Sequence, residues 1–416
     1  MMADHIPFVF GAEDSKLLKS FYSDSAIVRL SLQTHEKTFN DLPTGPSLWV
    51  DGGVDGLDKW TPQRITKKGK KTTRYEAYDE YIKHFPGHDQ VANNDFQSKP
   101  QNDVVKGFVE SILNKCCELS PKPAWVSVPQ LPMVSDASRN KINRALARNA
   151  AEWKRTSNYN VKLILPVIFT HSKQVNLKTQ RKGELAKECY ELARAHGVWV
   201  VDSTLNDQEG SGSLDKRFQG LIKFHQELAE ALPSDAIKIA GPYWGMNLIL
   251  WARGLIHFPA VGLGGAYRYY VPGLTPTAGV GRIALSPLRR LAIASPGLSG
   301  WLGQALTKII KGEPAYMEFG ELSRSLPRII KELEELSRSL PRIQLAPLGS
   351  KTQVARFYKS RLDGLASVPV SGRALALFQD FSKAFVLGRS LPTLPTAENT
   401  ARRPERVAQQ LMLNCL

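Results

Sequence analysis

Cysteine is scarce in this chain, and the few that occur are not spaced like metal ligands. Only 4 cysteines are found in 416 residues, and none belongs to a Cys-x-x-Cys element. Structural zinc sites are usually built from such paired elements, so we expect no structural zinc. The adjacent Cys116 and Cys117 fall in a helical pattern, where they are best explained as buried thiols of a protein core.

Long hydrophobic runs are also missing. No uninterrupted apolar stretch approaches the roughly 20 residues needed to cross a bilayer. Asp4 and His5 stand where a secretory signal would have a basic segment followed by an apolar run. We therefore expect no membrane partner, and a soluble, cytoplasmic protein with reduced thiols.

Acidic residues are too few to balance the basic ones. The chain has 39 Asp and Glu against 55 Lys and Arg, which gives a formal net charge of +16. Such an excess favours polyanionic partners, with nucleic acid foremost. The alternative is a generally basic surface without a nucleic-acid partner.

Alternating apolar and helical segments dominate residues 1–275. This alternation is typical of parallel strands joined by crossover helices, and it predicts an α/β fold, a TIM-like (β/α)8 barrel. An open doubly wound sheet would give a similar pattern. The predicted strands are 47–51, 124–128, 162–169, 198–202, 236–240 and 260–263, and the predicted helices are 104–119, 138–155, 181–196, 216–232 and 246–255.

The remaining residues, 276–416, have a different character. Strand signals fade, and Arg- and Leu-rich helical segments replace them. We expect a basic, helical C-terminal region that follows the barrel.

The segment Leu48-Trp49-Val50-Asp51-Gly52-Gly53 is the most informative for chemistry. An apolar strand delivers a carboxylate at its end, where barrel enzymes place catalytic groups, and two glycines let a ligand approach the backbone. Asp-Gly is also a common turn, so the motif alone is a weak signal. Asp51 is the predicted catalytic residue; Asp55 and Asp202 are predicted to assist it, although Asp202 also fits a turn with Ser203 and Thr204.

A dense basic run follows at residues 59–74, in which 7 of 16 residues are Lys or Arg and none is acidic. Such a loop beside Asp51 would contact phosphates, and nearby aromatic rings would stack on exposed bases. The alternative is a solvated surface loop. The predicted nucleic-acid-binding residues are Arg64, Lys67, Lys68, Lys70, Lys71 and Arg74.

Two further groups of residues suit the binding of an extruded nucleotide. The first, with Tyr243 and Trp244, lies where a helix begins after a predicted strand. The second, between Gly264 and Tyr269, combines glycines with tyrosines around an arginine, as a phosphate or base clamp requires. Packing at the top of the barrel would explain the first aromatic pair equally well. The predicted substrate-binding residues are Gly52, Gly53, His171, Tyr243, Trp244, Gly264, Gly265, Tyr267, Arg268 and Tyr269.

From about Ser47 to Gly273 the order of segments resembles the tRNA-guanine transglycosylase superfamily, including its relatives that insert deazaguanines into DNA. Asp51-Gly52-Gly53 is similar to the family's DSGG-type motif, and the stretch ending in Trp153-Lys154-Arg155 is similar to its W-A-K-R-like helix end. The resemblance implies a TIM barrel that acts on a base in nucleic acid.

The sequence differs from the family's pattern at two points, and these differences restrict the reaction that we expect. The family's F-D stretch, which carries its nucleophilic aspartate, corresponds here to Phe258-Pro259, and its zinc-binding cysteine cluster is absent. Without the nucleophile a covalent sugar–enzyme intermediate is hard to form, whereas Asp51 can still activate water. The resemblance and this loss together predict a DNA glycosylase that leaves an abasic site, requires no metal or cofactor, and is similar in concept to antiviral enzymes that excise modified bases from phage DNA.

Three alternatives stay open at this point. The chain could exchange bases in DNA or tRNA, with Asp202 replacing the missing nucleophile. It could bind nucleic acid without catalysis, or act on small sugar phosphates, in which case the basic run would be incidental.

Overall fold

The computed structural model describes most of the barrel and the C-terminal helices. The described residues are 5–9, 27–32, 46–54, 64–67, 70–73, 85–88, 91, 102–120, 122–133, 137–169, 179–202, 213–243, 245–262, 282–285, 290–293, 303–305, 307, 350–390, 409 and 411–415.

Eight parallel strands close into a barrel, so the predicted fold class is confirmed. Closure is direct, because Ile6 of the first strand pairs with Ala260 of the last. The strands, in their order around the barrel, are β1 (Ile6–Val9), β10 (Phe258–Gly262), β9 (Ile237–Ala240), β8 (Gly197–Asp202), β7 (Lys162–Phe169), β6 (Trp125–Ser127), β3 (Ser47–Asp51) and β2 (Ile27–Ser31).

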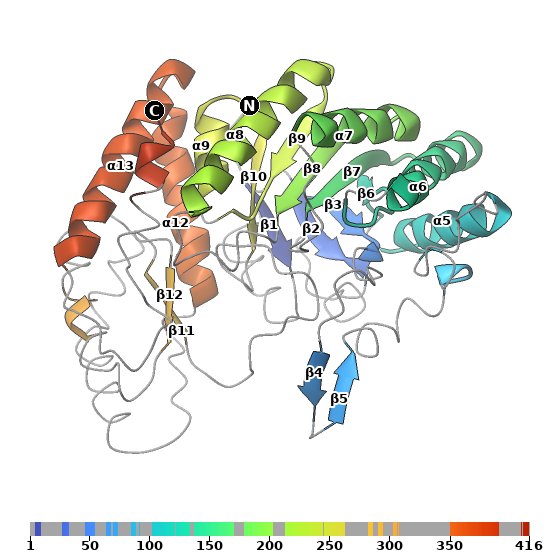
Figure 1. Ribbon diagram of the computed structural model, residues 1–416, viewed down its shortest axis with the longest axis horizontal. Helices are drawn as coiled ribbons and strands as arrows, with labels where there is room; N and C mark the ends of the chain where they lie inside the picture. Colours follow the sequence, from blue (N-terminus) through green and yellow to red (C-terminus); the bar gives the residue numbers. More distant parts are fainter. Residues whose placement is uncertain are drawn as a thin grey trace.

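Helices between the strands form the outer wall. Figure 1 shows α5 to α9 following one another along one side of the barrel, with the strand arrows pointing away from most of them towards the lower part of the view. Helices α5 to α8 combine buried and exposed positions, as crossover helices over a parallel sheet require, whereas all seven residues of α9 are buried. Their bounds are α5 (Asn102–Cys117), α6 (Ala137–Thr156), α7 (Thr179–Ala193), α8 (Ser213–Ala231) and α9 (Met246–Ala252).

The C-terminal region adds two long helices, α12 (Ser350–Ala366) and α13 (Val370–Ser390), as predicted. They are packed on the barrel: the buried Tyr358 hydroxyl donates to Asn247 Oδ1 of α9 at 3.1 Å, and the Asn247 amide donates to the Ala260 carbonyl at 2.7 Å. The region also contains an antiparallel hairpin, β11 (Arg282–Leu285) and β12 (Arg290–Ile293), where strands were not expected. Tyr358 thus ties the C-terminal region to strand β10.

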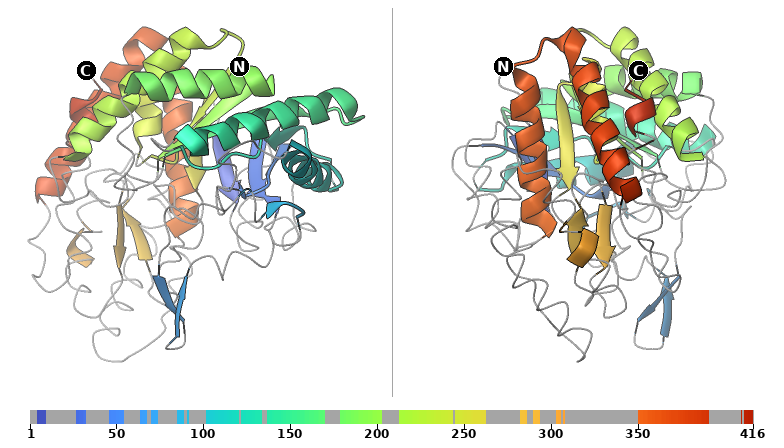
Figure 2. Two further views of the ribbon diagram at one scale, coloured as in Figure 1. Left: turned by 45° about the vertical axis from the view of Figure 1, so that its right-hand side comes forward. Right: turned by 90° about the vertical axis from the view of Figure 1, so that its left-hand side faces the viewer.

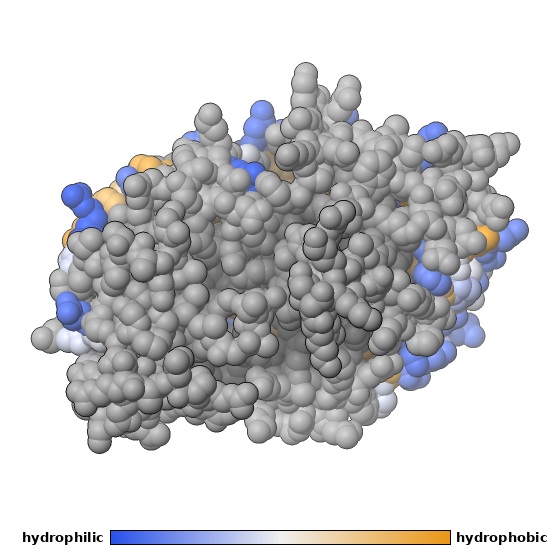
Figure 3. All heavy atoms as spheres, turned by 60° about the horizontal axis from the view of Figure 1, so that its bottom comes forward, coloured by the Kyte–Doolittle hydropathy of each residue, from blue (hydrophilic) through white to orange (hydrophobic). Residues whose placement is uncertain are grey.

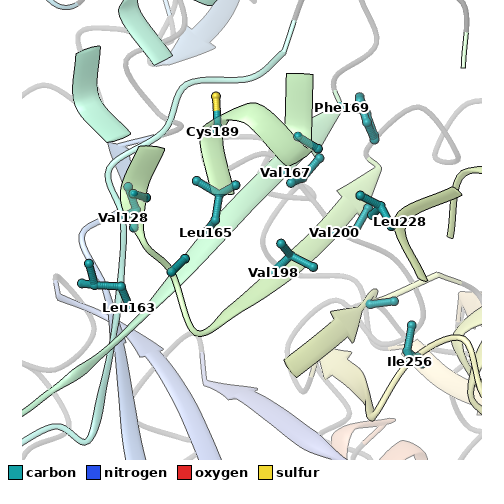
Figure 4. Packing of buried hydrophobic residues seen from close by; sticks show 14 of the residues in the cluster. Val128, Leu163, Leu165, Val167, Phe169, Cys189, Val198, Val200, Leu228 and Ile256 are labelled. Carbon is teal, nitrogen blue, oxygen red and sulfur yellow. The ribbon is translucent and has the colours of Figure 1, made fainter. Parts of the chain in front are cut away.

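Side chains of the strands alternate between two separate cores. On β7 and β8, the residues Leu163, Leu165, Val198 and Val200 face outward into the layer beneath the helices (Figure 4). Their neighbours in sequence face inward, because successive side chains of a strand point to opposite faces. The inward cluster includes Phe8, Trp49, Trp125, Ile164, Ile168, Trp199 and Val201.

Candidate functional site at the end of strand β3

Asp51 is the last residue of β3 and lies inside the barrel at the carboxyl end of its strands. It follows the inward-facing Trp49 by two positions, and it is 7% exposed. Its Oδ2 accepts a hydrogen bond from Arg29 Nη2, and its Oδ1 accepts one from the Gly53 amide at 3.2 Å. The predicted catalytic carboxylate is therefore buried, paired with a cation and held from two sides.

The two glycines after Asp51 are explained by geometry. Gly52 packs against α5, where a Cβ would come within 2.6 Å of Ile112 Cγ2. Gly53 has a φ of 70°, a left-handed conformation that favours glycine. Gly52 serves the packing of α5, and Gly53 turns the chain so that its amide reaches Asp51.

Arg29, on the neighbouring strand β2, was not predicted as a site residue. It is 5% exposed, and its guanidinium lies 4.4 Å from the ring centroid of Phe8, 4.6 Å from that of Trp199 and 5.8 Å from that of Trp49. These three rings, here called the aromatic cage, meet one another edge to face at centroid distances of 5.1–5.7 Å. Arg29 thus stands in an apolar enclosure with Asp51 as its ion-pair partner.

Both indole N–H groups of the aromatic cage donate hydrogen bonds to residues of the barrel. Trp49 Nε1 donates to Ser127 Oγ at 3.0 Å, and Trp199 Nε1 donates to the Gly241 carbonyl at 3.1 Å. Buried indole N–H groups usually find such partners, and these bonds fix the orientation of both rings. The cage is therefore a packed floor beneath Asp51.

Asp202 does not join Asp51. Val201 faces the barrel interior, so Asp202, the next residue, points to the outer face that Val200 also occupies. Burial lowers the pKa of Lys182 on α7, and the nearby Asp202 carboxylate partly offsets that shift. The prediction that Asp202 assists at the same site is thus not supported by the register of β8.

Tyr243 also lies in the outer layer. It is fully buried, its ring centroid is 6.2 Å from that of His225 on α8, and burial raises the pKa of its hydroxyl well above the usual value. A base could not stack on this ring without displacing the layer that covers it. Tyr243 is therefore better explained as a packing residue of the barrel than as a residue that stacks on a base.

The basic run contains a two-stranded hairpin, β4 (Arg64–Lys67) and β5 (Lys70–Thr73), in which Lys67 pairs with Lys70. Figures 1 and 2 show it projecting on the side towards which the barrel strands point, away from helices α5 to α9. Figure 3 turns this side towards the viewer, where the described residues are visible mainly at the margins and many are hydrophilic. The hairpin and Asp51 thus share one side of the molecule.

Other predicted site residues lie outside the described residues. They are Asp55, Lys68, Arg74, His171, Trp244, Gly264, Gly265, Tyr267, Arg268 and Tyr269.

Within the described ranges, no group of three or more His, Cys, Asp or Glu side chains is arranged to hold a metal ion. The expectations of no metal and no cofactor stay predictions. Among the helices whose placement is described, none is long and apolar enough to span a membrane. The four cysteines are buried and free, and burial raises the pKa of Cys117 and Cys189 to about 12, so these thiols suit a core.

No protein-family model matches this chain, and no curated protein is similar enough to it to count as a match.

Proposed function

We propose that this protein hydrolyses the N-glycosidic bond of a base in DNA, with Asp51 as the catalytic carboxylate. The observation that carries the proposal is the orientation of the Arg29–Asp51 pair. Arg29 is opposite Trp49 in the sheet register, two residues deeper in the barrel than Asp51. The backbone of Arg29 thus lies deeper than that of Asp51, and we infer that the carboxylate is the end of this buried ion pair nearer the carboxyl ends of the strands.

A negative group at this position suits glycosidic chemistry. The sugar becomes cationic at its anomeric carbon as the bond to the base breaks, and a fixed carboxylate stabilises that charge. The oxygen of a water molecule then bonds to the anomeric carbon and gives its proton to Asp51. The base leaves with the electron pair of the broken C–N bond and takes a proton from solvent.

The same ion pair argues against a small sugar phosphate as the substrate. A phosphate placed above Asp51 would meet the negative end of the pair, whereas Arg29 is enclosed by the aromatic cage. DNA can instead keep its phosphates on the basic hairpin β4–β5 and present only a sugar and base to Asp51. Excision of modified phage bases is the biological setting that we propose for this activity.

Hydrolysis is favoured over base exchange by the residues around the barrel. Phe258 is part of the inward-facing cluster, and Pro259 offers no nucleophile at the position that resembles the family's aspartate. Asp202, the substitute considered for exchange, faces the outer layer. Neither of the two positions considered for a second carboxylate, 259 and 202, therefore provides one beside Asp51.

The test is incubation of the protein with plain and base-modified phage DNA, followed by detection of abasic sites and released base. We expect abasic sites on at least one substrate, and a fall in rate of about 10²–10⁴-fold for Asp51→Asn. The matched control is Asp235→Asn, since Asp235 is an exposed carboxylate just before β9, at the opposite end of the barrel.

Three outcomes distinguish the hypotheses. Wild-type protein that produces neither abasic sites nor free base on any substrate refutes the glycosylase. Incorporation of a supplied free base indicates exchange. If Asp51→Asn protein still binds DNA and still protects cells fully against phage, the protein is a non-catalytic binding protein.

A further inference from the structure

We propose that Arg29 is the positioning residue for Asp51, and that the aromatic cage requires an arginine there. This proposal rests on the proposed function for its catalytic consequence, but the binding of a guanidinium group by the cage can be tested without substrate.

Two donors from different segments fix the carboxylate. Arg29 Nη2 holds Oδ2 from β2, while the Gly53 amide holds Oδ1 from the turn after β3. A carboxylate has about four lone-pair sites, so the two bonds leave acceptor capacity for water. Without Arg29, the Gly53 amide would be the one hydrogen-bond donor left to Asp51 among the described residues, and Oδ2 would lose its anchor.

The cage offers Arg29 ring faces in place of hydrogen-bond acceptors. Arg29 Nε is buried and makes no hydrogen bond to any described residue, which fits an enclosure made of Phe8, Trp49 and Trp199. A planar guanidinium stacks on such faces, whereas the ammonium of lysine is a strongly hydrated point charge. The aromatic cage therefore accommodates the planar guanidinium of arginine better than the ammonium of lysine. The positive charge of that guanidinium pairs with Asp51.

Removing Arg29 leaves Asp51 buried beside apolar rings. A carboxylate that has lost this donor is no longer held at a fixed position relative to the reacting carbon. We expect Arg29→Met, which keeps much of the side-chain volume, to lower the rate of base release by at least about 10²-fold, the scale of a misplaced catalytic group.

Chemical rescue separates positioning from general stability. Arg29→Ala opens a cavity inside the cage, and millimolar guanidinium should enter it, restore at least part of the lost rate and change the fluorescence of Trp49 and Trp199. Arg29→Lys should stay impaired, because its ammonium does not fit the rings. The control is Arg361→Ala, which breaks a partly buried pair of 2.9 Å between α12 and α13.

The binding of guanidinium does not depend on which substrate the protein takes. Guanidinium should bind Arg29→Ala more tightly than the double variant Arg29→Ala/Asp51→Asn, because the carboxylate anchors it. Equal binding to both, or no fluorescence change in a folded Arg29→Ala protein, overturns the proposal even if wild-type protein releases base. Full activity of Arg29→Lys also overturns it. If no variant with Ala at position 29 folds, the rate of base release by folded Arg29→Met decides: a rate like that of wild-type protein contradicts the role.

If wild-type protein releases no base, the glycosylase proposal fails. The cage is then judged by guanidinium binding alone.

Discussion

At the scale of single residues, the site depends on a carboxylate whose two oxygens have different anchors. Asp51 was predictable, because an apolar strand followed by Asp-Gly-Gly has a recognisable pattern. Arg29 was not, because it precedes its partner by 22 positions and no spacing rule links residues on adjacent parallel strands. Asp202 shows a related difficulty. The sequence of β8 indicates that its side chains alternate between two faces, but it does not indicate which of the two faces lines the barrel. That is determined by the packing of β8 against its neighbouring strands.

Gly53 provides the first prediction of stability at this scale. Gly53→Ala forces a side chain into the left-handed conformation and should lower the free energy of unfolding by about 1–2 kcal/mol. Urea denaturation measures this change. The rate of base release should fall as well, because the amide that holds Asp51 Oδ1 would shift.

The matched control is Gly107→Ala in α5, where a Cβ would meet nothing within 4 Å. Alanine should stabilise this helical position by roughly 0.5–1 kcal/mol. Equal effects of the two substitutions would contradict the strained role of Gly53.

At the scale of elements, long buried strands were the easiest to predict. The bounds of β3 and β7 agree with the prediction, since the apolar run of β7 is long and is buried on both faces. Strands β1 and β2 were missed. β1 is four residues long and contains Pro7, and β2 carries Arg29 in its middle, so neither forms the apolar run that marks a buried strand.

The hairpin β4–β5 carries the element-scale prediction. If Arg64, Lys67, Lys70 and Lys71 contact phosphates, replacing all four by alanine should weaken binding to duplex DNA and flatten its dependence on salt. Each lost contact lowers the slope of log K against log salt by about 0.9, so the total change should be up to about 3.6. Fluorescence anisotropy over a salt series measures both quantities.

The control replaces four exposed cations of the helical wall by alanine, namely Lys106, Lys115, Arg155 and Lys187. We expect a markedly smaller change in slope for this protein, because these residues lie on α5 to α7. The same loss from both sets would mean that the net charge, and not the hairpin, governs binding.

At the scale of the whole molecule, two buried histidines make stability depend on pH. Burial lowers the pKa of His225 to about 3, and burial together with Lys359 lowers that of His5 to about 3. In the unfolded chain a histidine binds its proton near pH 6.5. Between about pH 6.5 and pH 3 the unfolded state therefore binds more protons than the folded state. The free energy of unfolding falls as the pH decreases through this range.

Each histidine should contribute a slope of about 1.4 kcal/mol per pH unit in that window. His225→Phe removes one titrating group and a buried Nε2 that has no hydrogen-bond partner among the described residues. Urea denaturation between pH 6.5 and 5 should therefore show a shallower decline for His225→Phe than for wild-type protein. Parallel declines would show that His225 does not titrate on unfolding.

The direct pairing of β1 with β10 has a consequence for synthesis on the ribosome. Phe8 finds its partner Gly262 only after more than 250 further residues have been translated. At about 5–20 residues per second this takes roughly 10–50 s, during which the nascent sheet presents unpaired edges that can join other chains. A chain that stalls before β10 cannot close the barrel, so expression in cells should be sensitive to interrupted translation between β9 and β10.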